Sequence, residues 1–306
     1  MKNLLIALLS ILVLFSCKKE EKKKGINAKL KVVATTSQVT NLLNEVAGDL
    51  IELEGLMGAG IDPHLYKASE GDVTKFFNAD VIFYNGLHLE GKLDDVFNNM
   101  RKQGKKTIAI ANAVEKSKLI SSADFSSSYD PHFWFAIANW IKATNYVVEQ
   151  LSILDAKNAE AYKHNGQEYI AKLKVLQKDL LLQANELVKE KRVLVTAHDA
   201  FAYFGDAFDF EVVSLQGLST ATEAGVQDVQ KIAQVIIDKN VKAIFIESSV
   251  PVRTVEALQA AVKSKGHEVK IGGTLFSDAL GNPDTKEGTY TGMYRYNMNT
   301  IVNALK

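Results

Sequence analysis

The sequence predicts an α/β fold of two lobes, each a four-stranded parallel sheet with flanking helices, joined by one long rigid helix. Short runs rich in β-branched and aromatic residues alternate with stretches of helical spacing, which is typical of parallel sheets covered by helices. The alternation is interrupted once, by a helical stretch at 155–191. The chain has 306 residues, more than one ordinary hydrophobic core accommodates.

The first lobe is expected over residues 29–154. Its strands are predicted at 29–35, 51–57, 80–84 and 107–110. Its helices are predicted at 38–48, 69–78, 87–103 and 133–151. Glycines or Asn-Gly pairs follow two of these strands, as expected where a strand ends in a turn.

The stretch at 155–191 is expected to be the linking helix. It has no proline and is rich in Ala, Leu, Lys, Glu and Gln, which are good helix formers. Leu173, Leu176, Leu180 and Leu187 keep helical spacing, and Gly166 is the one glycine. A helix of this whole stretch would be about 50 Å long.

The second lobe is expected over residues 192–306. Its strands are predicted at 193–196, 211–215, 243–247 and 268–271. Its helices are predicted at 200–208, 225–239, 252–265 and 290–304. The same strand–helix order as in the first lobe indicates a second parallel sheet.

The N-terminus has the pattern of an export signal. Lys2 precedes an apolar stretch at 4–15, which is too short to span a bilayer comfortably. Cys17 follows it and is the only cysteine, so no internal disulfide is possible. Residues 1–17 therefore resemble a bacterial lipoprotein signal with a lipidated cysteine; the alternative is a plain secretory signal. Residues 18–28 are highly charged and predict a solvated tether to an extracytoplasmic (periplasmic or cell-surface) domain.

Charge excludes one class of function. Lysine plus arginine number 36, and aspartate plus glutamate also number 36. A chain without a net basic field lacks the electrostatic attraction on which nucleic-acid binding depends. The sequence therefore predicts no nucleic-acid partner.

Histidines lie directly after predicted strands, where ligands bind in open α/β sheets. His64 follows the second strand, His132 the fourth strand and its loop, and His198 the fifth strand. Asp278 follows the eighth strand. A single loop histidine is more commonly exposed or hydrogen-bonded than a ligand. The recurrence of this placement favours a shared metal site without by itself outweighing that interpretation, and Asp278 also fits the N-cap of a turn.

Asp-Pro-His occurs twice, at 62–64 and at 130–132. Proline fixes its own backbone and restricts the residue before it, which stiffens the loop that presents each imidazole. Asp62 and Asp130 are candidates to accept the second ring N–H of the neighbouring histidine. Glu247 ends a strand and fits equally a helix cap, an outer carboxylate or a ligand.

Three imidazoles and one carboxylate suit a divalent transition metal. Imidazole favours zinc among other ions, whereas carboxylate oxygen shifts the preference towards manganese. The lone cysteine excludes a thiolate site. The other histidines, His88, His164 and His267, lie beside charged residues and are interpreted as surface residues.

Seven segments together resemble the metal-binding receptors of ABC importers, the ZnuA/PsaA/TroA-like family, and most closely its TroA-like branch. They are GAGIDPHLY (58–66), DPHFWF (130–135), TAHDAFAYF (196–204), LQGLSTATEAG (215–225), IFIESSVP (244–251), LFSDALG (275–281) and EGTYTGMYRYN (287–297). The resemblance implies two lobes joined by a rigid helix, with zinc or manganese held between them and delivered to the permease and ATPase of an importer. It implies His64, His132, His198 and Asp278 as ligands, and nothing indicates more than a monomer.

The resemblance leaves the metal open. It implies glutamate at the third ligand position in manganese receptors and histidine in zinc-type and TroA-like members, and this chain has His198. However, the segment 116–129 contains no histidine, unlike the long histidine-rich loop of many zinc-specific relatives. Ligand chemistry favours zinc slightly, with manganese close behind.

Two other functions fit the same residues. A zinc-dependent hydrolase could use three histidines and a carboxylate, but catalytic zinc usually keeps an open water position, and no HExxH motif occurs. Glu247 is its one candidate base. A surface adhesin could use the metal for structure alone. For a receptor, ordinary histidine pKa values near 6.5 predict that affinity falls as the pH drops through about 6.

Overall fold

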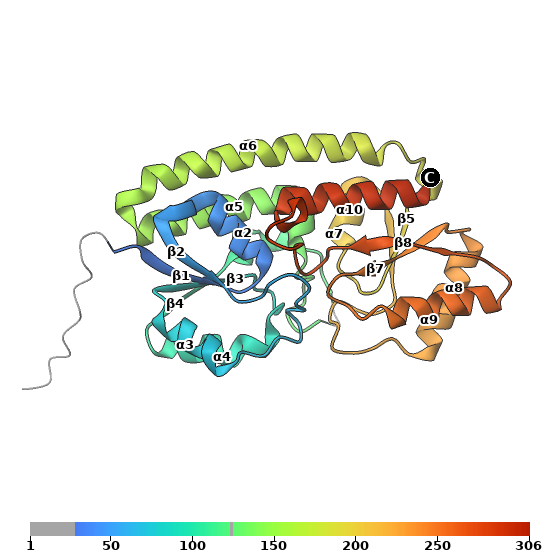
Figure 1. Ribbon diagram of the computed structural model, residues 1–306, viewed down its shortest axis with the longest axis horizontal. Coiled ribbons are helices and arrows are strands. Elements are labelled where there is room, and N and C mark those ends of the chain that lie inside the picture. The colour runs from blue at the N-terminus through green and yellow to red at the C-terminus, as the bar shows by residue number, and fades with distance from the viewer. Residues whose placement is uncertain (1–27, 123–124) are drawn as a thin grey trace, which may run out of the picture.

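The computed structural model describes residues 28–122 and 125–306. The predicted signal peptide with Cys17, and nearly all of the tether at 18–28, lie outside the described residues. In the described part, two lobes lie side by side along the long axis of the molecule (Figure 1). None of the helices described there is both long enough and apolar enough to cross a bilayer.

The N-terminal lobe contains one four-stranded parallel sheet, as predicted. Its strands are β1 (Leu30–Ala34), β2 (Ile51–Gly55), β3 (Val81–Tyr84) and β4 (Lys106–Ala109). They lie in the order β2-β1-β3-β4. Because every pair is parallel, all four carboxyl ends meet at one edge of the sheet.

Helices cover both faces of this sheet. α2 (Ser37–Ala47) and α5 (Ile137–Leu154) lie on one face, and α3 (Glu70–Asn78) and α4 (Asp94–Lys102) on the other (Figure 1). Successive residues of β1 point to opposite faces of the sheet. Val32 packs in the core beneath α2 and α5, and Val33 packs in the core beneath α3 and α4. This two-residue period is what a strand buried on both faces requires.

The start of α4 differs from the helix predicted at 87–103. Leu87 and His88 have φ angles of 53° and 63°, in the left-handed region that a right-handed helix excludes. A 3₁₀ turn at Gly91–Leu93 follows, and α4 begins only at Asp94. Residues 87–93 therefore have the apolar spacing of a helix, but their backbone is not α-helical.

The C-terminal lobe corrects one prediction. Its strands are β5 (Val193–Thr196), β6 (Glu211–Ser214), β7 (Ala243–Glu247) and β8 (Lys270–Leu275). They form two separate two-stranded parallel sheets, β5-β6 and β7-β8, so the predicted continuous four-stranded sheet was wrong here. β5 and β7 lie next to each other, but a side chain joins them at their carboxyl ends: Glu247 Oε1 accepts the backbone N–H of His198 at 2.9 Å.

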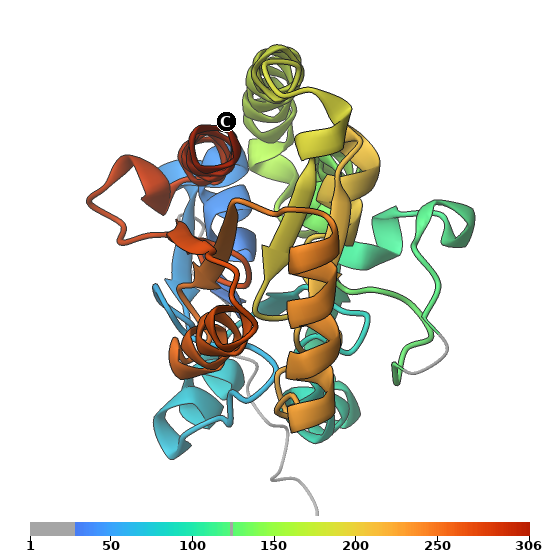
Figure 2. The same cartoon turned by 90° about the vertical axis from the view of Figure 1, so that its right-hand side faces the viewer.

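Helices also enclose the strands of this lobe. α8 (Val226–Asp238) and α9 (Arg253–Ser264) pack on the outer face through their own apolar core. α7 (Ala202–Phe208) and α10 (Tyr290–Leu305) lie on the other side. The end-on view shows the strands between α10 and the pair α8 and α9 (Figure 2).

One long helix, α6 (Ala159–Ala184), runs along both lobes (Figure 1). It contacts α2 and α5 of the first lobe and α10 of the second. Its 26 residues correspond to about 39 Å, less than the predicted stretch of 155–191. Asp155 accounts for the later start, because its carboxylate accepts hydrogen bonds from Asn158 and Tyr162 at 2.8 and 2.6 Å and turns the chain.

Gly166 lies inside α6 for a packing reason. A Cβ atom at this position would collide with Val148 Cγ2 of α5. Glycine therefore allows α5 and α6 to approach closely, at the conformational cost that glycine carries in a helix.

The lobes share one hydrophobic core. Two tyrosines of α10 reach into the first lobe: Tyr290 donates to the carbonyl of Trp134 at 2.6 Å, and Tyr294 to that of Phe135 at 2.5 Å. Both tyrosines are fully buried. Breaking this seam would expose aromatic surface and unpaired hydroxyls, so a wide opening of the lobes is costly.

Candidate metal centre

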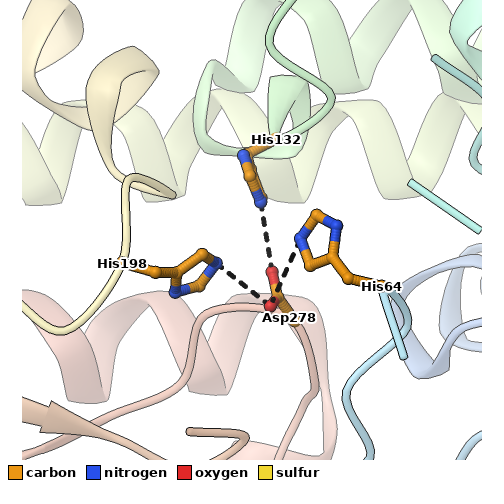
Figure 3. A group of neighbouring side chains, drawn as sticks. All are labelled: His64, His132, His198 and Asp278. Atoms are coloured by element: carbon orange, nitrogen blue, oxygen red, sulfur yellow. Dashed lines mark ion pairs between the residues drawn. The ribbon is translucent and has the colours of Figure 1, made fainter. Parts of the chain in front are cut away.

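Four side chains predicted as ligands meet between the lobes (Figure 3). His64 lies in the loop after β2 and His132 in the loop between β4 and α5. His198 lies in the loop after β5, and Asp278 in the loop after β8. One potential ligand atom from each lies within 4.8 Å of those of the others.

The carboxylate of Asp278 is at the centre of this group. The Nε2 atoms of His198, His132 and His64 lie 3.1, 3.3 and 3.8 Å from its oxygens. All four side chains are buried. Neither these three nitrogens nor the two Asp278 oxygens have a well-oriented hydrogen-bond partner among the described residues. A buried polar atom without a partner costs about 1–3 kcal/mol, so the arrangement is suited to a cation that all four would contact.

Charges are strongly coupled here. Burial alone would lower the pKa of His132, but the charge and hydrogen bond of Asp130 and the nearby charge of Asp278 outweigh it and raise that pKa to about 9. For His198, burial is likewise outweighed by Glu247 and Asp278, which raise its pKa well above 6.5. Burial would raise the pKa of Asp278, but the neighbouring histidines hold it well below 3.8.

His64 behaves differently from the other two imidazoles. Burial lowers its pKa to about 3, against the attraction of Asp278. The directions of these shifts favour the neutral form of His64, the protonated forms of His132 and His198, and the ionised form of Asp278. The two protons on His132 and His198 carry the same charge as one divalent ion, so exchanging them for that ion leaves the total charge of the buried centre unchanged.

His132 is held by its own Asp-Pro-His segment. Asp130 Oδ1 lies 2.7 Å from the ring Nδ1 and accepts the backbone N–H of His132 at 2.8 Å. Tyr203 of the second lobe donates to the carbonyl of Asp130 at 3.1 Å. The Asp130 carboxylate contacts the ring at Nδ1 and so leaves Nε2 as the nitrogen that faces Asp278.

His198 is held by Glu247. The carboxylate Oε2 lies 2.6 Å from the ring Nδ1, and Oε1 accepts the backbone N–H. Of the three roles considered for Glu247, this contact matches the outer carboxylate. Glu247 lies on the far side of the ring from Asp278, away from any position at which it could activate a metal-bound water.

Asp62 differs from its sequence-based interpretation. Its Oδ1 accepts the backbone N–H of His64 at 2.9 Å, and its Oδ2 accepts the Thr220 hydroxyl at 2.5 Å. The Asp62 carboxylate thus fixes the 58–66 loop and joins the two lobes. Its hydrogen bonds to the described residues go to the His64 backbone and to Thr220, not to the His64 ring. Burial raises the pKa of Asp62.

Sequence reasoning missed the residues that position the Asp278 loop. Gln38 donates to the carbonyl of Ser277 at 3.1 Å, and Ser37 accepts the backbone N–H of Leu280 at 2.8 Å. Asn297 makes two hydrogen bonds to the backbone of Phe276, at 2.7 and 3.0 Å. Their partners are more than 20 positions away in the chain, so no local pattern could have indicated them.

One ligand candidate borders an opening. His64 lines a surface pocket of about 280 Å³ between the lobes, whereas His132, His198 and Asp278 do not line it. The other lining residues come from the segments around 88–92, 125–126 and 219–221. The pocket therefore borders the buried centre at His64.

Comparison with known proteins agrees with this architecture. The manganese-binding lipoprotein MntA of Bacillus subtilis (strain 168) is 44% identical over 299 residues, covering 98% of this chain and 97% of MntA. The zinc-binding protein TroA of Treponema pallidum (strain Nichols) is 43% identical over 284 residues, covering 93% and 91%. The solved structure of the periplasmic zinc-binding TroA superposes with a TM-score of 0.88 at 44% identity, over 91% of this chain and 99% of that one.

A family model described as zinc-uptake complex component A, periplasmic, matches residues 32–304. The match covers both lobes and the helix between them. The chain belongs to this family of zinc-uptake components.

Proposed function

We propose that this protein is the extracytoplasmic receptor of an ABC-type importer, which captures Zn²⁺ or Mn²⁺ between its lobes and delivers it to the permease and ATPase. The observation that carries the proposal is that three buried Nε2 atoms lie 3.1–3.8 Å from one carboxylate, and that none of these atoms has a hydrogen-bond partner within residues 28–122 and 125–306. His64, His132, His198 and Asp278 would each supply one ligand atom. Relatives named as manganese- and zinc-binding proteins support it.

Cys17 would carry the lipid anchor, which holds the receptor at a bacterial membrane on the extracytoplasmic side, in the periplasm or at the cell surface. Two acyl chains anchor a protein stably, where one is marginal. Relatives named as lipoproteins support this part of the proposal. The tether at 18–28 would then hold the folded lobes away from the bilayer, and the lobes 29–154 and 192–306 would act as a monomer.

Release to the permease would begin at His64. Of the four proposed ligands it is the one that borders the surface pocket, and movement of its loop would break the Asp62–Thr220 hydrogen bond to the second lobe. His132 is fixed to both lobes by the buried seam and would stay in place. A small movement of the 58–66 loop therefore fits the structure better than a wide separation of the lobes.

Zinc is the metal we favour. Three imidazoles with one carboxylate are a common donor set for Zn²⁺, and manganese generally prefers more oxygen ligands. The names of the two relatives do not decide, because their identities of 44% and 43% are nearly equal. A hydrolase is disfavoured, since four protein ligands close the site and Glu247 already holds His198.

The proposal predicts about one equivalent of metal in protein purified without chelator or affinity tag. Mass spectrometry of the metal content, followed by competitive titration with Zn²⁺ and Mn²⁺, measures it. At a thousand times the Kd, zinc should add about 4 kcal/mol to the free energy of unfolding and raise Tm by roughly 10 °C. Absence of bound metal, and of a thermal shift with either ion, would refute the receptor function.

Chelation separates a receptor from a metal-stabilised adhesin. A receptor should lose its metal to a chelator, keep its far-ultraviolet circular dichroism, and regain full occupancy on addition of zinc. Unfolding on chelation would instead indicate a structural metal.

Replacing Glu247 with glutamine should weaken zinc binding about 10–100-fold, because the carboxylate that orients His198 is lost while the shape is kept. Isothermal titration measures the change. Glu223→Gln is the matched control, since Glu223 is an exposed carboxylate paired with Arg253 on the surface. Equal affinities of the two variants would contradict a positioning role for Glu247.

A further inference from the structure

The pocket that reaches His64 contains a second imidazole, that of His88. Phe125 lies against both rings in edge-to-face contacts, with centroids 6.4 Å from His64 and 6.1 Å from His88. His88 was interpreted from the sequence as an ordinary surface residue. Its side chain is 38% exposed, so an ion from solvent meets it before it meets the buried centre.

His88 has the same support as two of the proposed ligands. Its Nδ1 lies 2.7 Å from Asp94 Oδ2, as that of His132 lies 2.7 Å from Asp130 and that of His198 lies 2.6 Å from Glu247. A carboxylate on Nδ1 leaves Nε2 as the free nitrogen and makes it a better metal ligand. No described residue forms a hydrogen bond with His88 Nε2.

The backbone that presents His88 is strained and firmly held. Leu87 and His88 are consecutive non-glycine residues with positive φ. The fully buried Glu90 pins the turn: it accepts the backbone N–H groups of Asn85 at 2.7 Å and Gly86 at 3.2 Å, and the Thr35 hydroxyl at 2.7 Å. Such strain costs about 1–3 kcal/mol per residue and tends to persist at functional sites, where the surroundings enforce it.

Gly91 provides the space that the ring occupies. A Cβ atom at this position would lie 2.6 Å from His88 Nε2. The ring of His88 therefore packs against Gly91, and a larger residue there would force the ring to shift.

From this arrangement we infer that His88, oriented by Asp94, is a relay ligand: it binds the incoming divalent ion at the mouth of the pocket and passes it to His64. The inference rests on the proposed metal-receptor function. Lys92 also lines the pocket, and its positive charge opposes a resident cation. The contact with His88 is therefore transient, and the pocket is a passage rather than a storage site.

A relay ligand has a kinetic signature. It contacts the ion only during entry and exit, so its loss slows association and dissociation by the same factor. The Kd, which is the ratio of the two rate constants, stays unchanged. Loss of a resident ligand would instead accelerate dissociation and weaken binding.

Stopped-flow measurement of Zn²⁺ binding to the full chain tests the inference. Trp134 is the reporter, because its ring lies 5.2 Å from that of His132. His88→Asn is the main variant, since asparagine tolerates positive φ. Asp94→Asn tests the orienting carboxylate, and His164→Asn is the matched control on the exposed surface of α6, where the side chain is 70% exposed.

In His88→Asn the association rate constant should fall about tenfold, with an equal fall in dissociation to a chelator and an unchanged Kd. Asp94→Asn should show a smaller fall, and His164→Asn none. An association rate equal to that of the unmodified protein, with or without a lower Tm, would make His88 merely structural and overturn the inference. Weakened Kd with faster dissociation would also overturn it. If the unmodified protein bound neither zinc nor manganese, the proposed function itself would fail.

Discussion

Zinc affinity should fall about a thousandfold when His198 is replaced by alanine, which corresponds to about 4 kcal/mol. The variant loses a ligand and also leaves Glu247 and Asp278 as buried carboxylates without the imidazole between them. The fall in zinc affinity should therefore exceed the 10–100-fold fall expected for Glu247→Gln, which removes a carboxylate that contacts His198 but not the metal. Competitive titration with a chelator of known affinity measures it, together with the zinc-induced change in Tm.

His164→Ala is the control for this experiment. His164 is exposed on α6, outside the loops that carry the four proposed ligands, and pairs with Glu168 at 3.5 Å. It should bind zinc as the unmodified protein does. If the thermal stabilisation by zinc survived in His198→Ala, then His198 would not be a ligand and the centre would need reassignment.

Acidification should weaken zinc binding steeply, and from a higher pH than the sequence alone suggested. Ordinary histidines would place the fall near pH 6. In the structure, the pKa of His132 is raised to about 9 and that of His198 is raised well above 6.5. Each ring must lose its proton to bind metal. Between about pH 6.5 and 9 the release of the His132 proton should change the affinity about tenfold per pH unit, and about a hundredfold per unit wherever His198 is protonated as well.

Calorimetric titration in two buffers of different ionisation enthalpy counts these protons directly. His132→Gln should reduce the number from about two to about one, which assigns one proton to this residue. A count near zero at pH 7, with affinity constant down to pH 6.5, would mean that the imidazoles are neutral in the metal-free protein.

The raised pKa of His132 has the opposite effect on the stability of the protein without metal: this stability falls as the pH rises. A group whose pKa is higher in the folded than in the unfolded state stabilises the fold fully below its unfolded value, and this stability is lost as the pH rises through the folded value. For His132 these limits are about 6.5 and about 9. The metal-free protein should therefore lose stability across this range while zinc binding becomes stronger, so the gap between the two Tm values should widen.

The ligand candidates could be found in the sequence because of where parallel strands end. His64, His198 and Asp278 each follow a strand closely, and carboxyl ends of parallel strands meet at one edge. The repeated Asp-Pro-His added a rigid presentation. Strand ends and the Asp-Pro-His motif are local properties of the sequence, so they can be recognised without the tertiary structure.

The role of His88 could not be found in this way. The sequence around it has helical spacing, and only the positive φ angles of Leu87 and His88 show that the chain does something else. Those angles depend on Glu90, which reaches Thr35, 55 positions away. A prediction from local pattern has no access to such a contact.

By itself, then, the sequence determined the class of the fold, the order of nearly every strand and helix, and the residues that meet between the lobes, because periodicity and strand ends are local. The tertiary structure decided the separation of the second lobe into two small sheets, the shorter α6, the protonation of the centre and the placement of Asp62 against Thr220. Each of these depends on atoms distant in the chain, through burial, charge and close packing, and those quantities exist only once the lobes have come together.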